Sequence, residues 1–596
     1  MRPIFDTTST RTRRRPRWTI AAVLAGVLLA LPIATAAAQD SGDSGGDFSG
    51  GFGVENGSGD GTGDGFGSFG SFGDSGSAAA ALEWGGRLRF DARAIADYDR
   101  PEDSATTGDA QAQLELSYTA DNSEAHVRLE ATDGFLADGS APGGATGATA
   151  TGATAAMDEF LRTFVDEAYL QLYYDRFNLQ AGYLKTVWGQ GDQVHVVDFL
   201  NSNDYSDFIN PDYIERRLAS GMVKLNVPWN SAAGRSGQVE LAVLPVLRPD
   251  FLPEQGTWAP AQAAMLQQLL TGYAGALTDL REAQLDAALS PVDGAALEPE
   301  SALWAQATAA GALTTADTRT LNYAQAAARA TARLGGVDLG AVYYWGYRKT
   351  PSPRIRLADP DAFAAFLASP GSASPAPDPE GEVRLEYDPL QGFGLEGATV
   401  IGPFNVRAEA AYYLTEDIAG DDPEVPNNSL EYLLGFDVDL GISSLNLNVQ
   451  GTGSYILNSD AIDEAGPVAN VSSALKTAAQ SDATLAAVLD ASPYAVLYLD
   501  PNARLNYQYD PDGIYTSHVV SAALTDSWNN DRVRPEVSVA MGIERQDVRV
   551  EPSVEFVLRD DARFEVSSVV FAGDEAGVFG QYDANDYVQL RFQYSF

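Results

Sequence analysis

The sequence predicts an all-β protein: one transmembrane antiparallel up-and-down β-barrel of about 16–18 strands, with helical insertions in long loops at one end. Three observations lead to this prediction. Apolar and polar residues alternate with period 2 over most of the chain, short turns alternate with long loops, and the N-terminus carries an export signal.

The N-terminal residues have the three parts of a secretory signal peptide. Basic residues fill positions 11–17, an apolar stretch covers 20–33, and small residues occupy 36–38. A membrane anchor is the alternative, but Pro32 and the small residues shorten the apolar core below the roughly 20 residues that a spanning helix needs. We therefore expect residues 1–38 to be a cleaved signal peptide. Residues 39–81, rich in Gly, Ser and Asp, then form a disordered linker, and residues 82–596 form the barrel.

The first predicted strand shows the alternation clearly. Trp84, Leu88 and Phe90 lie on one face, and Arg87 and Arg89 lie on the other, because successive strand side chains point to opposite sides of a sheet. The same pattern recurs up to the last residues of the chain. It favours a barrel wall over a propeller or solenoid, because no fixed repeat of 20–50 residues accompanies it.

Turns and loops alternate in length along the chain. Short turns are expected at 121–123, 175–177, 335–336, 402–403 and 441–444, and long loops at 133–163, 189–217, 248–320, 349–380 and 458–513. This asymmetry is typical of transmembrane barrels. We count eighteen strands, and sixteen remains open because 382–400 and 514–528 are poorly delimited. A soluble antiparallel sandwich is the alternative fold.

Energetics decides which face of the strands meets lipid. An arginine that faces lipid at the bilayer midplane costs about 2–4 kcal/mol, so the charged face should line a watery lumen. Ten arginines on this face are the predicted pore-lining charges, and such charges tune ion selectivity. They are Arg87, Arg89, Arg93, Arg128, Arg329, Arg333, Arg407, Arg534, Arg549 and Arg591. The alternative is that many of them pair with lumen acids and only brace the wall, the candidate acids being Asp91, Glu130, Glu409, Glu536 and Glu551.

Aromatic residues gather near the predicted strand ends. They occur at 173–174, 343–345, 412–413 and 528. A ring with a polar tip suits the boundary between lipid and water, so these residues are expected to form interfacial girdles.

The last ten residues read YVQLRFQYSF from Tyr587 and alternate strictly. Val588, Leu590, Phe592, Tyr594 and Phe596 share one face. With the export signal and the strand rhythm, this ending resembles that of large bacterial outer-membrane β-barrel proteins of the porin-like kind. The resemblance implies that Tyr587 to Phe596 is the signal read by the barrel-assembly machinery and that this strand closes onto 84–98. It also implies an outer-membrane location, with residues 39–81 in the periplasm.

One stretch, GYLKTVWGQGDQVHVVDFLNSNDYSDFINPD, is similar to a feature of such barrels in which a strand leads into a Trp-Gly turn and an Asp/Asn-rich external loop. Its oxygen-bearing residues are Asp192, Asp198, Asp204, Asp207, Asp212, Asn201, Asn203 and Asn210. Oxygen-rich loops can bind Ca²⁺, but this spacing lacks the alternation and the closing Glu of the twelve-residue calcium loop. Solvated turn-forming residues are the preferred explanation, and no metal is predicted.

Composition narrows the function further. The net charge of −44 argues against nucleic acid as a partner, and the absence of cysteine excludes thiol chemistry. The only histidines are His126, His195 and His518, and no spacing supports a nucleophile, base and orienting group, so no enzyme, catalytic residue or cofactor is predicted. Helical segments are expected within the long loops at 261–289, 361–367 and 468–489.

These observations predict an outer-membrane channel for passive diffusion of small hydrophilic solutes, partly filled by loops. Its expected partners are membrane lipid, the assembly machinery and those solutes. Two alternatives are an adhesin that displays acidic loops on a closed barrel, and a transporter of hydrophobic or polymeric ligands. The sequence leaves the solute and the oligomeric state open.

Overall fold

The structure is a computed structural model. It describes residues 81–96, 105–136, 164–192, 194–207, 213–231, 235–253, 258–259, 313–357, 381–481, 486, 489 and 496–596. The predicted signal peptide (1–38), the linker up to residue 80 and the predicted helices at 261–289 and 361–367 lie outside these residues.

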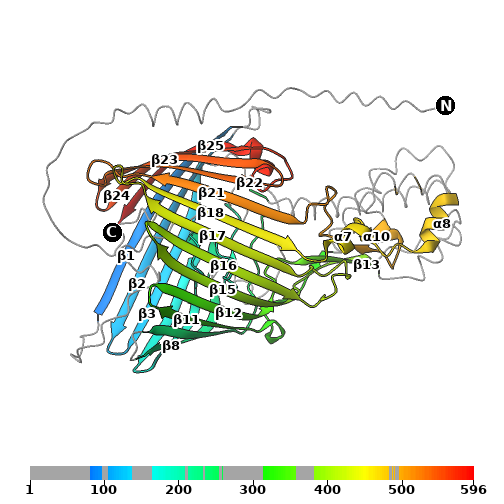
Figure 1. Cartoon of the computed structure of the whole chain (residues 1–596), viewed down its shortest axis with the longest axis horizontal. Coiled ribbons are helices and arrows are strands. Elements are labelled where there is room, and N and C mark those ends of the chain that lie inside the picture. The colour runs from blue at the N-terminus through cyan, green and yellow to red at the C-terminus, as the bar shows by residue number, and fades with distance from the viewer. Residues whose placement is uncertain are drawn as a thin grey trace.

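Eighteen antiparallel strands form one closed barrel (Figure 1). The strands are β1 (Ala81–Ala96), β2 (Ala105–Ala120), β3 (Ser123–Leu136), β4 (Val165–Tyr174), β5 (Phe177–Leu184), β8 (Ser220–Asn230), β9 (Ser236–Leu244), β11 (Gln325–Leu334), β12 (Val337–Tyr347), β15 (Pro389–Ile401), β16 (Phe404–Thr415), β17 (Ser429–Asp439), β18 (Asn446–Ile456), β21 (Thr516–Thr525), β22 (Val533–Gly542), β23 (Asp547–Arg559), β24 (Ala562–Ala572) and β25 (Asp586–Ser595). Each strand pairs with the next, and β25 pairs with β1. The predicted fold class and even strand number are confirmed.

The smaller elements belong to the connections at the long-loop end. A three-stranded sheet contains β10 (Leu313–Thr315), β13 (Ser352–Leu357) and β14 (Gly381–Glu386). The region 382–400, poorly delimited in the sequence, therefore divides into β14 of this sheet and β15 of the barrel.

Among the described residues of the connection between β18 and β21, helices are formed by α7 (Ser459–Ala465), α8 (Ser473–Ser481) and α10 (Val496–Leu499). In Figure 1 they lie beyond the end of the barrel opposite the C-terminus. Helix α8 falls within the predicted helical stretch 468–489, whereas α7 and α10 were not predicted. None of the helices that the structure describes is both long and apolar enough to cross a membrane.

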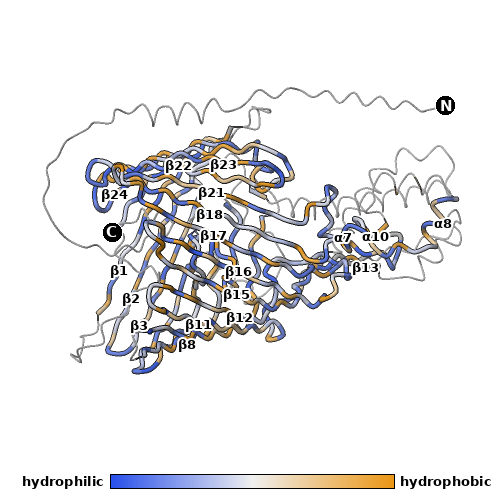
Figure 2. The backbone as a smooth tube through the Cα atoms, in the orientation of Figure 1, coloured by the Kyte–Doolittle hydropathy of each residue, from blue (hydrophilic) through white to orange (hydrophobic). Residues whose placement is uncertain are grey.

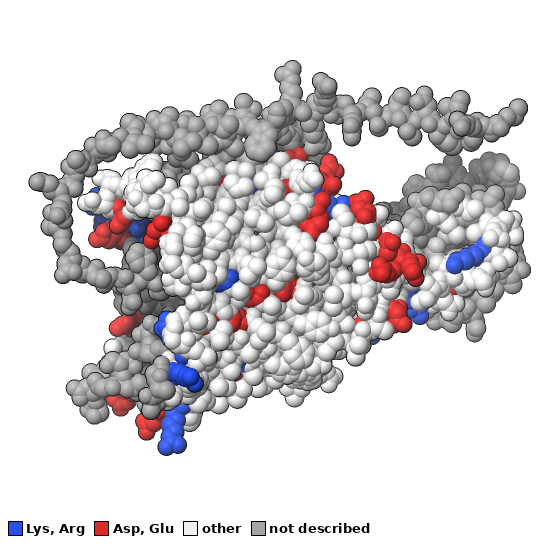
Figure 3. All heavy atoms as spheres, viewed as in Figure 1, with Lys and Arg blue, Asp and Glu red and all other residues white. Residues whose placement is uncertain are grey.

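Exposure of side chains confirms the predicted division of faces. On β1, Trp84 is 68% exposed on the outside, whereas Asp91 is 4% and Arg93 is 6% exposed on the inside. On β15, Leu395 is 64% exposed beside Glu396 at 5%. Figure 2 shows this as alternating hydrophilic and hydrophobic colour along the strands. In Figure 3, most of the wall in view is uncharged, and the larger groups of charged side chains lie toward the two ends of the barrel.

The barrel closes at a glycine pair on β1. The amide of Gly86 donates to the carbonyl of Phe596 at 3.0 Å, and the amide of Phe596 donates back to Gly86 at 2.9 Å. A Cβ on Gly86 would lie 2.6 Å from the Phe596 ring and 2.5 Å from the Gln113 carbonyl oxygen. The absence of a side chain therefore lets the terminal ring pack against the seam, beside Trp84 at a centroid distance of 6.1 Å.

The aromatic girdle prediction is only partly right. Tyr343 and Trp345 are exposed on the outer face at 40% and 50%, but Tyr344 is fully buried inside the barrel. Tyr413 also points inward and donates a hydrogen bond to the Val196 carbonyl at 3.0 Å. Adjacent aromatics within a strand face opposite sides, which explains Tyr343 and Tyr344, whereas Tyr173 and Tyr174 at the end of β4 are both exposed, at 38% and 47%.

The face assignment predicts the effect of a charge placed on the outer wall. Leu395→Arg should lower the free energy of unfolding by about 2–4 kcal/mol, because the guanidinium would face hydrocarbon near the middle of β15. Denaturant titration in lipid vesicles measures this, with Leu395→Met as the apolar control. Equal stability of the two variants would contradict a lipid-facing Leu395.

Candidate functional site

The loop between β5 and β8, residues 185–219, folds into the barrel. Its described part contacts β16 and β18 through Asp192 and contacts β1 through Glu215. It therefore reaches two well-separated parts of the wall. The Asp/Asn-rich stretch was predicted to be an external loop, and this prediction is wrong. We call residues 185–219 the infolded loop.

Glu409 of β16 holds one turn of the infolded loop. Its carboxylate accepts backbone N–H bonds from Gln190 at 2.5 Å, Gly191 at 2.6 Å and Val196 at 2.8 Å. His195 Nδ1 lies 3.3 Å from the same group, and the Glu409 side chain is completely buried. Several donors thus offset the cost of burying this charge.

Glycine is required where the loop wraps around this carboxylate. Gly189 has φ +131°, a conformation that residues with a Cβ rarely adopt. A Cβ there would also lie 2.5 Å from both a Glu409 carboxylate oxygen and His195 Nδ1. The Trp-Gly turn noted in the sequence therefore exists because the wall approaches the loop backbone closely.

Asp192 forms the second anchor on this side. It makes an ion pair with Arg407 of β16 and accepts a hydrogen bond from Asn448 of β18 at 2.9 Å. The backbone amide of Asp192 donates to Gln450 at 3.2 Å. Arg407 also pairs with Asp437 of β17 at 2.6 Å, so one guanidinium joins the loop to β16 and β17.

The other end of the loop is anchored to β1. Glu215 lies in the short helix α3 (Tyr213–Arg216) and accepts from Arg87 at 2.6 Å and Arg89 at 2.9 Å. Burial alone would raise the pKa of the Glu215 carboxyl, but the two guanidinium groups hold it well below its ordinary value. Asp207 makes a further ion pair with Arg93.

Between these anchors the loop contributes an apolar core inside the barrel. Trp188, Val197 and Leu200 are each fully buried, and they pack with residues of the inner wall such as Tyr344 and Leu433. Phe199 stacks on Tyr344 at a centroid distance of 5.4 Å.

Two glycines of β15 make room for this core. A Cβ on Gly392 would lie 2.6 Å from the Phe199 ring, and one on Gly394 would lie 2.8 Å from Val197. One side of the lumen is therefore packed like a protein interior.

A second loop also reaches across the lumen. Trp258, from the connection between β9 and β11, packs against Phe571 of β24 and Tyr587 of β25, each at a centroid distance of 6.0 Å. Tyr582, in the 3₁₀ segment Gly580–Asn585, completes the contact at 5.5 Å. Tyr587 thus faces inward, whereas Val588, Leu590, Phe592 and Phe596 are exposed on the outside.

A polar network joins three loops at the long-loop end. Asp250 accepts from the Asn203 amide at 2.8 Å and from the Thr350 hydroxyl at 3.2 Å. Lys349, next to Thr350, donates to Gln325 at 2.7 Å. Loss of hydration lowers the pKa of the Lys349 ammonium to about 7, although the Asp250 carboxylate acts in the opposite direction.

All ten predicted pore-lining arginines have a carboxylate partner. Arg87, Arg89, Arg93 and Arg407 bind the infolded loop as described above. The other pairs lie within the wall: Arg128–Glu167 at 3.1 Å, Arg329–Glu396 at 2.7 Å, Arg333–Asp338 at 3.3 Å, Arg534–Glu555 at 3.1 Å, Arg591–Asp91 at 2.7 Å, and Arg549–Glu551.

Arg333 and some of the candidate bracing acids differ from what the sequence predicted. Arg333 does not lie deep in the lumen: its side chain is 67% exposed at the short-turn rim beside Gly335. Among the candidate bracing acids, Asp91 and Glu551 do pair with arginines, whereas Glu409 binds the loop and Glu130 accepts from Gln111 at 2.7 Å. The selectivity role of the arginines stays a prediction.

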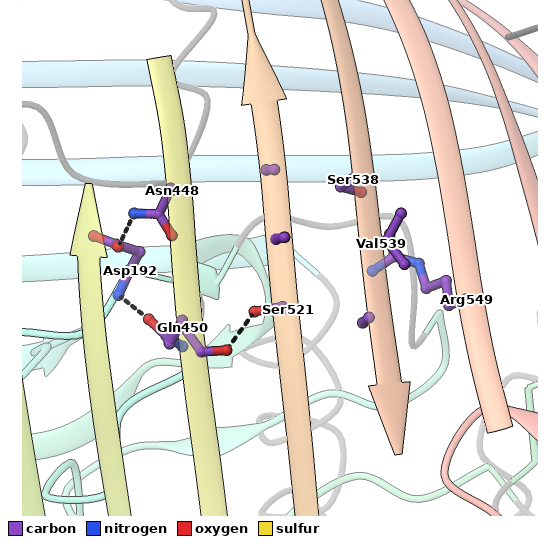
Figure 4. A pocket seen from close by; sticks show the side chains of 10 residues that line it. Asp192, Asn448, Gln450, Ser521, Ser538, Val539 and Arg549 are labelled. Carbon is purple, nitrogen blue, oxygen red and sulfur yellow. Dashed lines mark hydrogen bonds between the residues drawn. The ribbon is translucent and has the colours of Figure 1, made fainter. Parts of the chain in front are cut away.

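A polar pocket lies on the side of the barrel away from the apolar core. It lies along β18, β21, β22 and β23 and has an empty volume of about 360 Å³, part of it open to solvent. Its polar lining residues are Asp192, Asn448, Gln450, Ser521, Ser538 and Arg549. Figure 4 shows Asp192, Asn448 and Gln450 on one side and Arg549 on the other.

The preferred explanation of these acids as solvated turn residues is wrong for Asp192 and Asp207, which pair with arginines of the wall, whereas Asp204 does accept the Ser206 amide at 2.8 Å in an exposed turn. Asp198 pairs with Arg217 and accepts from Tyr213 at 2.9 Å. Within the described residues, no group of three or more His, Asp or Glu is arranged to hold a metal ion. Asp212 and Asn210 lie outside those residues.

Sequence reasoning missed Trp188 and Glu215 as site residues. One signal for an inward fold was available, because the apolar run Val-Val-Asp-Phe-Leu at 196–200 sits inside an otherwise polar loop. Apolar side chains need a partner surface, and an external loop offers little.

Comparisons with known proteins find only distant similarities to solved structures. No family model matches, and no curated relative matches. Among solved structures, OccAB4 of Acinetobacter baumannii aligns at 8% identity and a TM-score of 0.41, covering 87% of this chain and 98% of that one. OccAB3 of the same organism aligns at 10% and 0.38, covering 86% and 99%. The outer membrane channel DcaP, also from that organism, aligns at 10% and 0.32, covering 88% and 99%. These similarities support no conclusion about function. The assignment of the fold rests on the strand pairing described above.

The role of Glu409 as an anchor predicts that its removal changes amide hydrogen exchange in the adjacent part of the infolded loop. Glu409→Ala should accelerate amide hydrogen exchange in residues 188–197 by roughly 10- to 100-fold, because each hydrogen bond to a charged group contributes about 1.5–3 kcal/mol. Mass spectrometry of the exchanged peptides measures this. Asp338→Ala at the short-turn rim is the control and should leave these amides unchanged. Unaltered protection in Glu409→Ala would show that the apolar core alone holds the turn.

Lys349 predicts a pH dependence of stability. Its folded pKa of about 7 lies below its ordinary value, so the unfolded chain binds more protons between pH 7 and about 10.4. The free energy of unfolding should therefore rise with pH through this window. The rise should be smaller in Lys349→Met, which lacks the amine. Parallel pH profiles for the two proteins would contradict a lowered pKa.

Proposed function

We propose that the chain forms an outer-membrane channel for passive diffusion of small hydrophilic solutes, after export across the inner membrane. The observation that carries the proposal is the polar pocket along β18 to β23, which Asp192 of the infolded loop also lines and which we propose to be part of a passage. Amide, hydroxyl and guanidinium groups line this passage, while the outer wall is apolar.

The lining favours small polar solutes. Asn448, Gln450 and Ser521 can donate and accept hydrogen bonds, so they can replace part of the water around a polar solute. Asp192 pairs with Arg407, and Arg549 pairs with Glu551, so both charged lining groups have a countercharge beside them.

Passive flow is favoured because the infolded loop is fixed on both sides. Its anchors to β1 and β16 act together with an apolar core. Moving the loop aside would expose that core and leave charges unpaired, which is costly. Solutes would therefore pass beside the loop, without a conformational cycle.

The alternatives lead to different expectations. A transporter of hydrophobic ligands would need an apolar pocket or a lateral opening, whereas the β1–β25 seam pairs continuously from Arg87 to Ala96. A closed barrel that serves as an adhesin would conduct no ions. Membrane fractionation after cell breakage tests the location, because release into the detergent-free wash would contradict it.

A bulky residue in the passage tests the channel. Ser521→Trp should lower single-channel conductance in planar bilayers and slow the swelling of liposomes in neutral sugars, because the indole would fill space between β18 and β22. Leu524→Trp on the same strand is the matched control, since Leu524 is 39% exposed on the lipid side. The control should conduct like the unmodified protein. Absence of current in the unmodified protein would contradict the proposed function.

A further inference from the structure

Trp258 belongs to the connection that leaves β9, yet its ring packs on a distant part of the wall. Its partners are Phe571 of β24 and Tyr587 of β25. On one side of the ring of strands, β9 is separated from β25 by β8, β5, β4, β3, β2 and β1. Trp258 is only 6% exposed. We call the aromatic residues that share its apolar cluster the aromatic socket, namely Phe571, Phe579, Tyr582 and Tyr587.

The aromatic socket is held in place by the barrel itself. The amide of Phe571 donates to the Asp586 carboxylate of β25 at 2.8 Å. The amide of Phe579, in the connection between β24 and β25, donates to the carboxylate of Asp547 on β23. Because surroundings that are fixed in this way collapse only partly when a large side chain is removed, the loss of Trp258 would leave open space beside these residues.

The aromatic socket adjoins the polar pocket along β18 to β23. Ala540 of β22 packs against the cluster that contains Trp258, and Ala540 also lines the pocket. The strand register shows the same contact, because Ala540 pairs with Arg549 of β23, and Arg549 pairs with Phe571 of β24. Arg549 lines the pocket as well, as Figure 4 shows. One row of inward-facing residues therefore continues from the pocket into the socket.

The cluster lies toward the long-loop end of the pocket. Strand β21 begins at that end with Thr516, so Val519 lies closer to the long loops than the lining residues Ser521 and Ala523. Val519 packs against the cluster that contains Trp258. A solute that comes from the long-loop end would thus pass the cluster before it reaches the polar lining.

We propose that Trp258 sets the upper size limit of the solutes that reach the polar pocket from the long-loop end. The inference rests on the proposed channel function, and it names a residue that decides which hydrophilic solutes the channel accepts. The indole occupies space next to Ala540 and Val519. It carries no charge, so it restricts the width of the path and leaves ion preference to other groups.

The chain has no cysteine, so Trp258→Cys introduces a single thiol whose size can be changed afterwards. Swelling of liposomes in a trisaccharide, relative to swelling in a monosaccharide, should become roughly 2- to 5-fold faster, because the space left by the indole closes only partly. Benzyl methanethiosulfonate adds an aromatic ring to the thiol and should restore the original ratio. Methyl methanethiosulfonate adds only a small group and should not restore it.

Trp345→Cys is the matched control, because Trp345 of β12 is 50% exposed on the outer face. Its swelling ratio should equal that of the unmodified protein with either reagent. Trp258→Phe keeps an aromatic ring, covers the case in which the thiol variant does not fold, and should raise the ratio by a smaller factor. An unchanged ratio in the folded variants of Trp258 would overturn its role and leave the channel function intact. Absence of solute flux through the unmodified protein would instead contradict the channel function itself.

Discussion

The structure depends on one constraint: a charged side chain cannot face hydrocarbon, and a charge enclosed in a narrow lumen needs a partner. The first half of this constraint assigns the two faces of every strand, as Leu395 and Glu396 show on β15. The second half organises the interior. Arg329, only 4% exposed, is held between Glu396 at 2.7 Å and Glu240 at 3.3 Å. Removing one partner of such a pair would leave a buried charge unpaired, at a cost of about 3–5 kcal/mol.

The same requirement explains why a loop fills part of the barrel. Arg93 and Arg407 obtain part of their compensation from Asp207 and Asp192 of the infolded loop. In return the wall supplies Glu409, whose carboxylate accepts loop amides that would otherwise be buried without a partner. The wall and the loop therefore supply ion-pair and hydrogen-bond partners to each other, and neither has a complete set of partners alone.

The contacts between wall and loop also separate the features that a sequence can predict from those that it cannot. Strand faces follow from residues two positions apart, so the barrel, its even strand number and the closing strand could be predicted. The infolded loop depends on pairs 114 to 258 residues apart, and no local period encodes those. Tyr344 and Tyr413 illustrate the limit: their position near strand ends is local, but their inward packing on Phe199 depends on a distant loop. Arg333 shows the same limit, because the alternation predicts which face of the strand a residue occupies but not its position along the barrel axis.

The contacts of the infolded loop must offset the conformational entropy that the loop loses when it becomes ordered. Fixing one backbone residue costs about 1–2 kcal/mol, so a loop of this length cannot be held by a single ion pair. Anchors at two separate parts of the wall and an apolar core around Trp188 and Phe199 share that cost. The lumen is therefore closely packed on one side and lined by polar groups on the other. Because its anchoring charges neutralise one another, the field in the remaining water is set by the groups left without a partner.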